Sequence, residues 1–220
     1  MNLRTSTPGS RPLLVTDCDE VLMHMVVPFR GWLDEAHGID FAMEATDFSG
    51  ALKRRECGTR LGRAEVWPLL EAFFTDEMAR QYPVDGAFEA LARIGGQADI
   101  VVLTNIGDIM HPLRAAQLRT HGLDCALVCN RGPKGPALAK IIAEHEPSVV
   151  VYVDDLAQHI DSAARDAPGA WRLQMVAEPE IAPQIATAPC AHARIDDWAS
   201  AINWIEERFA MGHAAPDSQA

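Results

Sequence analysis

The stretch Leu13-Leu14-Val15-Thr16-Asp17-Cys18-Asp19-Glu20-Val21-Leu22 joins a short β-strand pattern to two aspartates. Successive side chains of an extended chain point to opposite faces, so Asp17 and Asp19 share one face and Cys18 takes the other. Two acids on one face repel each other, and an unpaired ionised carboxylate is costly to bury. The pattern therefore predicts a strand that ends at these acids. Whether the acids form a site or only a solvated turn depends on the rest of the chain.

The composition is that of an acidic globular protein. The chain has 220 residues, of which 48% are hydrophobic, enough for one domain with or without a small insertion. Asp and Glu total 31 against 19 Lys and Arg, a formal charge of -12. This excess of acids argues against a nucleic-acid partner, and an anionic substrate would need a local cation or lysine.

The spacing of the cysteines and the length of the apolar runs indicate the cellular compartment. The five cysteines are dispersed and lack C-x-x-C spacing, which favours reduced thiols over disulfides or a zinc site. Residues 1–11 are polar, as in a frayed leader, and no apolar run is long enough for a signal peptide or a membrane span. We therefore expect a cytoplasmic monomer or homodimer without a membrane partner.

The segment after the first strand has helical periodicity. Apolar residues at helical spacing predict helices over 28–37 and 62–80, with Gly38 as the stop of the first and Pro68 near the start or at a kink of the second. Residues 39–58 are loosely patterned, with a turn or a helix cap at Asp47. We expect residues 25–82 to be all-helical.

From residue 82 onward, helices and strands alternate. Apolar runs predict strands at 13–16, 100–103, 126–129, 149–153 and 171–176. The predicted helices between and after them cover 87–94, 109–120, 136–145, 156–166 and 198–209. This alternation is typical of an α/β fold with a doubly wound parallel sheet that has helices on both faces.

Polar residues follow four of these strands. In doubly wound sheets, ligands bind beyond the carboxyl ends of the strands, and parallel strands bring these ends to one edge. The acids at this edge would repel one another without a cation, and carboxylates select Mg²⁺. A hydroxyl and a lysine there offer donors to an anion such as phosphate. The residues are Asp17 and Asp19, Thr104 and Asn105, Asn130 leading to Lys134, and Asp154 with Asp155.

Four motifs in this order resemble the haloacid dehalogenase-like superfamily, which is dominated by Mg²⁺-dependent phosphohydrolases. The matching stretches are LLVTDCDEVL, DIVVLTN, GPKGPALAKI and VVVYVDDLAQHI, spread over residues 13–176. The resemblance implies that Asp17 is the nucleophile that becomes an aspartyl-phosphate and that Asp19 is the general acid and base. Such a nucleophile requires that the repulsion between carboxylate and phosphate be neutralised.

The resemblance also implies the binding residues. Thr104, Asn105 and Lys134 would bind the phosphoryl group. Mg²⁺ would be held by Asp17, the backbone carbonyl of Asp19, and Asp154, with Asp155 in support.

Two positions depart from the family pattern. Glu20 and Val21 replace the frequent Gly-Thr after the aspartate pair, which removes a flexible glycine and adds a charge. In the fourth motif, Gln158 or His159 stands where a further acid or amide is common. Metal affinity could therefore be weaker than is usual in the family.

The resemblance implies a core of residues 1–24 and 85–220, with a helical C1-type cap over residues 25–84. We call residues 25–84 the cap segment. A closed cap excludes macromolecules, which favours a small phosphorylated metabolite as substrate. The alternatives are a dehalogenase or phosphomutase of the same fold, and a non-enzymatic ligand-binding protein. Asp19 and the acidic pair count against a dehalogenase, which needs neither.

Other polar and aromatic residues have simpler interpretations. We expect Lys140 to be a solvated helix residue, and Asp196-Asp197 to cap the last helix. Trp67, Phe73 and Phe74 are expected in the core of the cap segment rather than in a substrate platform. Seven of the eight histidines lack ligand-like spacing and are expected on the surface or in loops; they are His24, His37, His111, His121, His145, His159 and His192.

Overall fold

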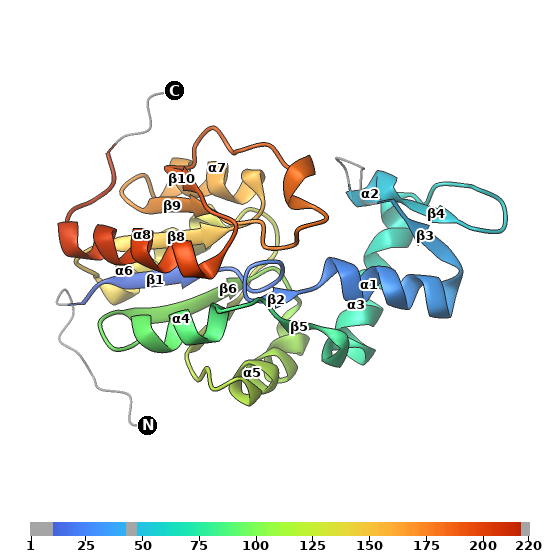
Figure 1. Ribbon diagram of the computed structural model, residues 1–220, viewed down its shortest axis with the longest axis horizontal. Helices are drawn as coiled ribbons and strands as arrows, with labels where there is room; N and C mark the ends of the chain where they lie inside the picture. Colours follow the sequence, from blue (N-terminus) through green and yellow to red (C-terminus); the bar gives the residue numbers. More distant parts are fainter. Residues whose placement is uncertain (1–10, 43–47, 217–220) are drawn as a thin grey trace.

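A parallel β-sheet forms the centre of the molecule. The computed structural model describes residues 11–42 and 48–216; residues 1–10 of the predicted leader and the turn or cap at Asp47 lie outside this part. Within it, six parallel strands form the main sheet in the order β10-β9-β8-β1-β6-β7 (Figure 1). Their bounds are β1 Leu13–Thr16, β6 Asp99–Thr104, β7 Ala126–Cys129, β8 Val150–Asp154, β9 Trp171–Gln174 and β10 Ala193–Arg194. The predicted α/β doubly wound parallel sheet is confirmed, and β10 is an edge strand that we did not predict.

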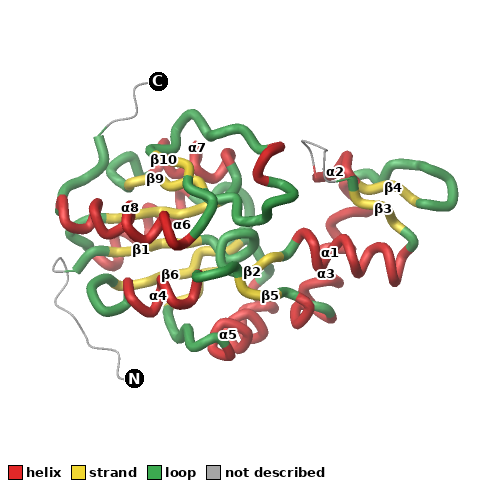
Figure 2. The backbone as a smooth tube through the Cα atoms, viewed as in Figure 1, coloured by secondary structure: helices red, strands yellow, loops and turns green. Residues whose placement is uncertain are grey.

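Helices cover both faces of the sheet. Leu14 of β1 belongs to the hydrophobic cluster beneath α4 and α8, whereas Leu13 and Val15 belong to the cluster beneath α6 and α7. Because both faces are buried, the strand is continuously apolar rather than alternating. The helices around the sheet are α4 Ala87–Ile94, α5 His111–Thr120 with the 3₁₀ turn η3 Asp108–Met110 before it, α6 Gly135–His145, α7 Ala157–Asp166 and α8 Trp198–Met211 (Figure 2).

The helix after β10 begins as expected. Asp197 is its N-cap, and its carboxylate accepts a hydrogen bond from the Ser200 backbone N–H at 2.7 Å. Asp196 instead accepts from the side chain of Arg194 and the backbone N–H of Val176. Only the second acid of the pair therefore caps the helix.

The long loop between β9 and β10 contains the 3₁₀ turn η4 Ala182–Gln184.

The cap segment lies beyond the carboxyl end of β1, to one side of the sheet (Figure 1). It has its own hydrophobic cluster, which includes Phe29, Trp32, Leu52 and Phe73. Trp67 is 61% exposed, so its expected place in this core is wrong, whereas Phe73 is fully buried. The helical elements are α1 Val26–Trp32, continued by the π-helix η1 Leu33–His37, then α2 Phe48–Ala51, α3 Arg63–Asp76 and the 3₁₀ turn η2 Met78–Arg80.

The expectation that residues 25–82 are all-helical is wrong. Strands β3 Ile39–Phe41 and β4 Leu52–Arg54 pair antiparallel beside the helices. Each strand has three residues, too few to produce an alternating pattern that can be told from a loop. The burial of Ile39 and Leu52 in the cluster of the cap segment holds this pair in place.

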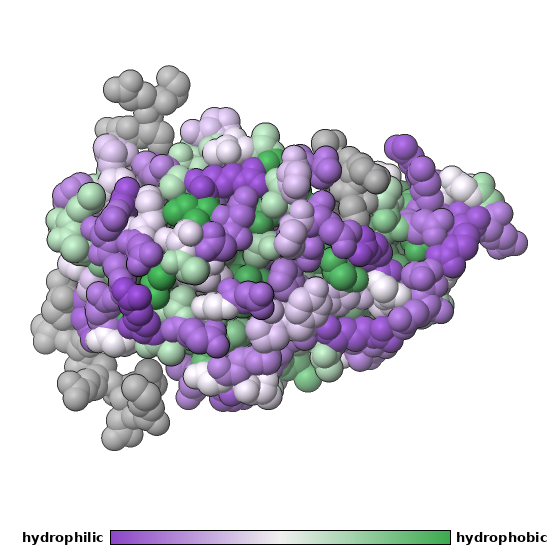
Figure 3. Space-filling model, in the orientation of Figure 1, coloured by the Kyte–Doolittle hydropathy of each residue, from purple (hydrophilic) through white to green (hydrophobic). Residues whose placement is uncertain are grey.

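Two chain crossings connect the cap segment to the sheet. Strand β2 Met23–His24 leaves the sheet, strand β5 Tyr82–Pro83 returns to it, and the two pair antiparallel. The proposed division at residues 25 and 84 falls at this pair and stays a prediction. None of the helices in the described part is long and apolar enough to cross a membrane. The face drawn in Figure 3 is mostly hydrophilic, with small separate hydrophobic areas.

Candidate active site

Lys134 connects two aspartates at the carboxyl edge of the sheet. Asp17 follows β1 and Asp154 ends the neighbouring strand β8, because the register pairs Thr16 with Val153. Lys134 precedes α6, and its Nζ lies 2.6 Å from Oδ2 of Asp17 and 2.8 Å from Oδ2 of Asp154. All three residues are buried. Lys140, in contrast, has a side chain that is 77% exposed and lies beside Glu144, so it is the surface residue that we expected.

Burial governs the charge of Asp17 and Lys134. Burial raises the pKa of Asp17 to about 7, against the opposing effect of Lys134 and together with the charges of Asp154 and Asp19. Burial also disfavours the charged form of Lys134, but the carboxylates of Asp154 and Asp17 outweigh it and raise the pKa of the amine. Lys134 therefore stays cationic, whereas Asp17 holds its proton more tightly than an exposed aspartate does.

The carboxylates of Asp17, Asp154 and Asp155 could hold a metal ion, since one oxygen of each lies within 4.8 Å of the others. Asp154 already accepts three hydrogen bonds: Oδ2 from Lys134 and, at 2.6 Å, from the hydroxyl of Tyr152, and Oδ1 from the Leu156 backbone N–H at 3.0 Å. Asp155 is half-buried, and burial followed by the charges of Asp154 and Asp17 raises its pKa well above the usual value. A divalent cation between three acids would favour their ionised forms and offset their mutual repulsion. Because all the donors are carboxylate oxygens, this donor set fits Mg²⁺.

Asp19 is held by Arg114 and Gln81, two residues that we did not predict from the sequence. Arg114 of α5 donates to both carboxylate oxygens, at 2.8 and 3.1 Å, and its other terminal nitrogen lies 3.0 Å from Sγ of Cys18. Gln81 donates to Oδ1 of Asp19 at 2.7 Å. Both contacts come from Nη2 of Arg114, so one guanidinium nitrogen spans the two oxygens of Asp19, and the hydrogen bond from Gln81 further restricts the carboxylate.

Arg114 could have been found from a weak signal. Arg114 and Leu118 are the two buried residues of α5, and they stand four positions apart on one helix face. An arginine on the face of a helix that is otherwise buried needs an anionic partner. The sequence contains this spacing, but nothing in it shows that the partner is Asp19, 95 residues away.

Gln81 lies where the cap segment returns to the sheet. It is buried directly before β5, and its amide oxygen is 3.5 Å from the side-chain nitrogen of Gln117 on α5. The same nitrogen of Gln117 donates to the Met78 carbonyl at 3.0 Å. The returning strand is thereby tied to both Asp19 and α5.

The predicted phosphate-binding residues divide into two groups. The hydroxyl of Thr104 is buried and lies 3.4 Å from Oδ2 of Asp19, so Thr104 joins the aspartates and Lys134. Asn105 is exposed, and its amide donates to the Gly132 carbonyl and accepts from the side chain of Asn130. It lies at the margin of the site, in a hydrogen-bond network of the neighbouring loops.

His159 is one of two histidines for which the expected surface position is wrong. It is 4% exposed, and Nε2 lies 3.3 Å from the Asn105 amide. Burial lowers the pKa of His159, which favours the neutral imidazole. The other is His24, whose side chain is 12% exposed and lies next to two glutamates.

Glu20 takes over the backbone geometry that a glycine usually provides. Its φ is 61°, in the left-handed region that residues other than glycine rarely adopt. Its Oε1 accepts hydrogen bonds from the backbone N–H groups of Met25 and Val26, at 2.7 and 2.6 Å. The departure from the family pattern therefore gives α1 a carboxylate at its N-terminus, where the unsatisfied N–H groups lie.

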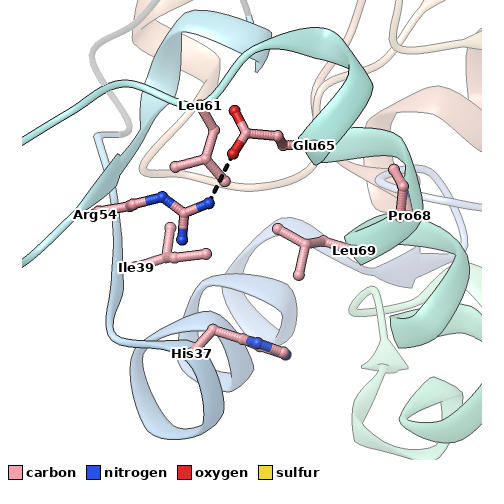
Figure 4. A pocket seen from close by; sticks show the side chains of 7 residues that line it. All are labelled: His37, Ile39, Arg54, Leu61, Glu65, Pro68 and Leu69. Carbon is pink, nitrogen blue, oxygen red and sulfur yellow. Dashed lines mark hydrogen bonds and ion pairs between the residues drawn. The ribbon is translucent and has the colours of Figure 1, made fainter.

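A shallow cavity lies inside the cap segment (Figure 4). It has a volume of about 270 Å³, and an ion pair between Arg54 and Glu65 at 2.6 Å crosses its mouth. Its lining residues are His37, Ile39, Arg54, Leu61, Glu65, Pro68 and Leu69. None of them lies at the carboxyl ends of the six-stranded sheet, so this cavity is separate from the aspartates.

No family model and no curated protein matches this chain. Solved structures do match it over nearly the full length of both chains. A haloacid dehalogenase-like protein of unknown function from Agrobacterium tumefaciens is 17% identical, covers 90% of this chain and 99% of its own, and gives a TM-score of 0.61. A HAD-superfamily hydrolase, subfamily IA, variant 1, from Geobacter sulfurreducens is 16% identical, with coverages of 89% and 100% and a TM-score of 0.53.

A third structure was solved with ligands. The D,D-heptose 1.7-bisphosphate phosphatase from B. bronchiseptica, complexed with magnesium and phosphate, is 14% identical, with coverages of 89% and 98% and a TM-score of 0.51. At these identities the matches establish the fold. The resemblance drawn from the four motifs is confirmed at that level: the chain has the fold of the haloacid dehalogenase-like hydrolases.

Proposed function

We propose that the protein is a Mg²⁺-dependent phosphohydrolase that cleaves a small phosphorylated metabolite through an aspartyl-phosphate on Asp17. The observation that carries this proposal is the buried lysine between Asp17 and Asp154, next to an Asp19 held by Arg114. A carboxylate attacks a phosphate ester only where positive charge offsets their repulsion, and Lys134 supplies part of it. The phosphatase of the same fold that was solved with magnesium and phosphate supports the same reaction class.

The metal is assigned to Asp17, Asp154, Asp155 and the backbone carbonyl of Asp19. Asp154 offers Oδ1, which accepts one hydrogen bond, from the Leu156 backbone N–H, while its Oδ2 accepts from Lys134 and Tyr152. It orients Lys134 and keeps the amine charged. Bound Mg²⁺ supplies Lewis-acid stabilisation of the charge on the phosphoryl oxygens.

The first step forms the bond between Asp17 and phosphorus. One carboxylate oxygen of Asp17 attacks the phosphorus, the bond to the ester oxygen breaks, and Asp19 gives its proton to the departing alkoxide. Lys134 and the hydroxyl of Thr104 hold the transferring phosphoryl oxygens. Both aspartates are fixed for this step, Asp17 by the Cys18 backbone N–H at 2.7 Å and Asp19 by Arg114.

The second step releases phosphate. Asp19, now ionised, takes a proton from a water molecule whose oxygen attacks the phosphorus, and the bond to Asp17 breaks. The products are inorganic phosphate and the free carboxylate of Asp17. The proton that Asp19 takes from water replaces the one that left with the alcohol, so the cycle closes.

The test is phosphate release from a panel of phosphorylated metabolites, with Mg²⁺ and with excess EDTA. We expect release from at least one ester with Mg²⁺ and none in EDTA. Full turnover in EDTA would contradict the metal assignment. A folded, Mg²⁺-loaded protein that hydrolyses no ester would favour a non-enzymatic ligand-binding protein. Halide release from haloacids and transfer of the phosphoryl group within a sugar phosphate are the readouts for the dehalogenase and phosphomutase alternatives.

A further inference from the structure

Three further side chains converge at the junction between the sheet and the cap segment. Glu20 follows the aspartate pair, His24 lies in β2, and Glu178 lies in the loop after β9. Nδ1 of His24 is 3.2 Å from Oε2 of Glu178 and 3.9 Å from Oε2 of Glu20, and all three atoms lie within 4.8 Å of one another. We call these residues the junction cluster.

Both glutamates are fixed by their other oxygen. Oε1 of Glu20 accepts from the backbone N–H groups of Met25 and Val26, and Oε1 of Glu178 accepts from the backbone N–H of Glu180 at 3.1 Å. The backbone therefore orients each carboxylate and leaves Oε2 directed at His24. Such support of ligand side chains by further hydrogen bonds is typical of metal sites.

Two of the three facing atoms lack a hydrogen-bond partner in the described part of the chain. Glu20 is 4% exposed, and its Oε2 has no hydrogen-bond partner among the described residues; Nδ1 of His24 has none either. Glu178 is 5% exposed and adds a second buried negative charge. A buried polar atom without a partner costs free energy, and a buried unpaired carboxylate costs more. The position between the three atoms is therefore suited to a cation.

We propose that the junction cluster binds a divalent transition-metal ion such as Zn²⁺, at a site separate from the Mg²⁺ site. One imidazole nitrogen with two carboxylate oxygens is a donor set that suits Zn²⁺, whereas Mg²⁺ prefers oxygen ligands alone. Ligands at about 2.0–2.2 Å from a zinc ion lie roughly 3–4 Å from one another. The separations of 3.2 and 3.9 Å around His24 Nδ1 already fall in that range.

The bound ion fastens the cap segment to the core. His24 lies in the strand that leaves the sheet, and its ring contacts Tyr82 of the returning strand at 4.8 Å between centroids. Glu178 precedes Glu180, which pairs with Arg30 of α1. The ion therefore joins the loop after β9 to both the strand pair and the start of α1. This inference does not depend on the proposed phosphatase activity.

A proton on His24 is the rival occupant. An imidazolium would place one positive charge between two carboxylates and leave the cluster with a net charge of -1. Glu178 alone is near enough to His24 for a short ion pair, and Glu20 at 3.9 Å is not hydrogen-bonded to it. Metal binding distinguishes the two occupants, because the cluster takes up a metal ion only if a proton on His24 is not its occupant.

The experiment measures binding of Co²⁺, as a spectroscopic substitute for Zn²⁺, and of Zn²⁺ itself, to the full chain in saturating Mg²⁺. Asp155→Asn removes a ligand of the Mg²⁺ site but leaves the junction cluster intact. We expect one equivalent of Co²⁺ in both the wild type and Asp155→Asn, with the visible absorption of a coordinated ion. No binding to the wild type, or binding that Asp155→Asn abolishes, would overturn the proposal, and neither result requires a variant of the cluster to fold.

A matched pair of variants identifies the ligands. Glu178→Gln removes a proposed ligand, whereas Glu180→Gln lies two residues further along the same loop and removes only the ion pair with Arg30. We expect Glu178→Gln to weaken Co²⁺ binding by roughly 10–100-fold or more, and Glu180→Gln to leave it unchanged. Equal affinities for the two variants, with both folded by circular dichroism, would contradict the assignment.

Discussion

At the scale of single residues, Asp17 and Asp19 share a strand end but have different neighbours. Asp17 lies against Lys134, and Asp19 lies against Arg114 and Gln81. The first carboxylate meets the lysine that we propose to bind phosphate, whereas the second is held by side chains of other elements. The proposed division of tasks, nucleophile and proton carrier, follows this difference in surroundings.

Substitutions of the two aspartates by asparagine should differ in their dependence on the substrate. Asp17→Asn removes the attacking carboxylate, so we expect turnover to disappear for every ester. Asp19→Asn removes the proton donor, which is typically worth roughly 10²–10⁴-fold. The loss should be large for alkyl phosphates and small, in the first step, for activated aryl phosphates.

Rapid-quench trapping of the phosphoenzyme from an aryl phosphate checks both roles. Asp19→Asn should accumulate the aspartyl-phosphate, because it also lacks the base for the water. Equal losses on aryl and alkyl esters, without any phosphoenzyme, would mean that Asp19 is not the acid and base.

Two lysines of one helix region provide a matched comparison. Lys134→Ala removes the only cationic side chain in contact with Asp17 among residues 11–42 and 48–216, and loss of one such donor typically lowers kcat by roughly 10²–10³-fold. Lys140→Ala removes a lysine with a largely exposed side chain and should leave kcat unchanged. Steady-state kinetics, corrected for the folded fraction, decide the matter. Comparable losses in the two variants would show that Lys134 has no special role.

At the scale of elements, helix α5 and the turn after β1 are joined by Arg114. The guanidinium is fully buried, and its contacts with Asp19 and Cys18 link the two elements. Because removal of one partner leaves the other charge buried and uncompensated, such pairs are costly to break, by roughly 3–5 kcal/mol. The link therefore contributes to both the fold and the position of Asp19.

Arg114→Met should separate these two contributions. We expect a lower free energy of unfolding and, in the protein that remains folded, a larger loss of kcat on alkyl than on aryl phosphates, since Arg114 acts through Asp19. Arg119→Met, a substitution in the last turn of the same helix, is the control. A loss in Arg114→Met that is the same for both classes of ester would indicate a structural role only.

The sequence predicts secondary structure well where local pattern and burial agree. Helices α4, α5, α6, α7 and α8 begin and end within about two residues of their predicted bounds. The antiparallel pair of β3 and β4 and the edge strand β10 were missed, because strands of two or three residues carry almost no periodic signal. Their pairing is decided by the burial of residues such as Ile39 and Leu52 in the finished structure.

At the scale of the whole molecule, negative charge concentrates at the carboxyl edge of the sheet. Three carboxylates converge there with one lysine in contact, and the chain as a whole has a charge of -12. Burial and mutual repulsion raise the pKa of Asp17 to about 7 and that of Asp155 well above its usual value. A ligand that offsets this repulsion stabilises the folded state alone, because the unfolded chain does not assemble the site.

Removal of Mg²⁺ should therefore lower the melting temperature as well as abolish activity. At a free Mg²⁺ concentration about 100 times Kd, binding contributes about 2.7 kcal/mol to the free energy of unfolding. Asp155→Asn should melt at the same temperature with Mg²⁺ and with EDTA. Differential scanning calorimetry checks this, and an unchanged melting temperature of the wild type in EDTA would contradict Mg²⁺ binding at this edge.

The sequence by itself determined the alternating fold and the positions of the acids at the strand ends. Both follow from local properties: periodic burial sets each element, and parallel strands bring their carboxyl ends to one edge. The sequence alone therefore predicts that Asp17, Lys134 and Asp154 lie together at this edge.

Only the tertiary structure decided which side chains from distant parts of the chain meet. Arg114 and Gln81 reach Asp19 across 95 and 62 positions, and Glu178 reaches His24 from the loop after β9. Periodicity indicates that a residue faces inward, but it carries no information about what the residue meets there. That depends on strand order and on how the cap segment packs against the core, which are set by contacts between elements and not by any one of them.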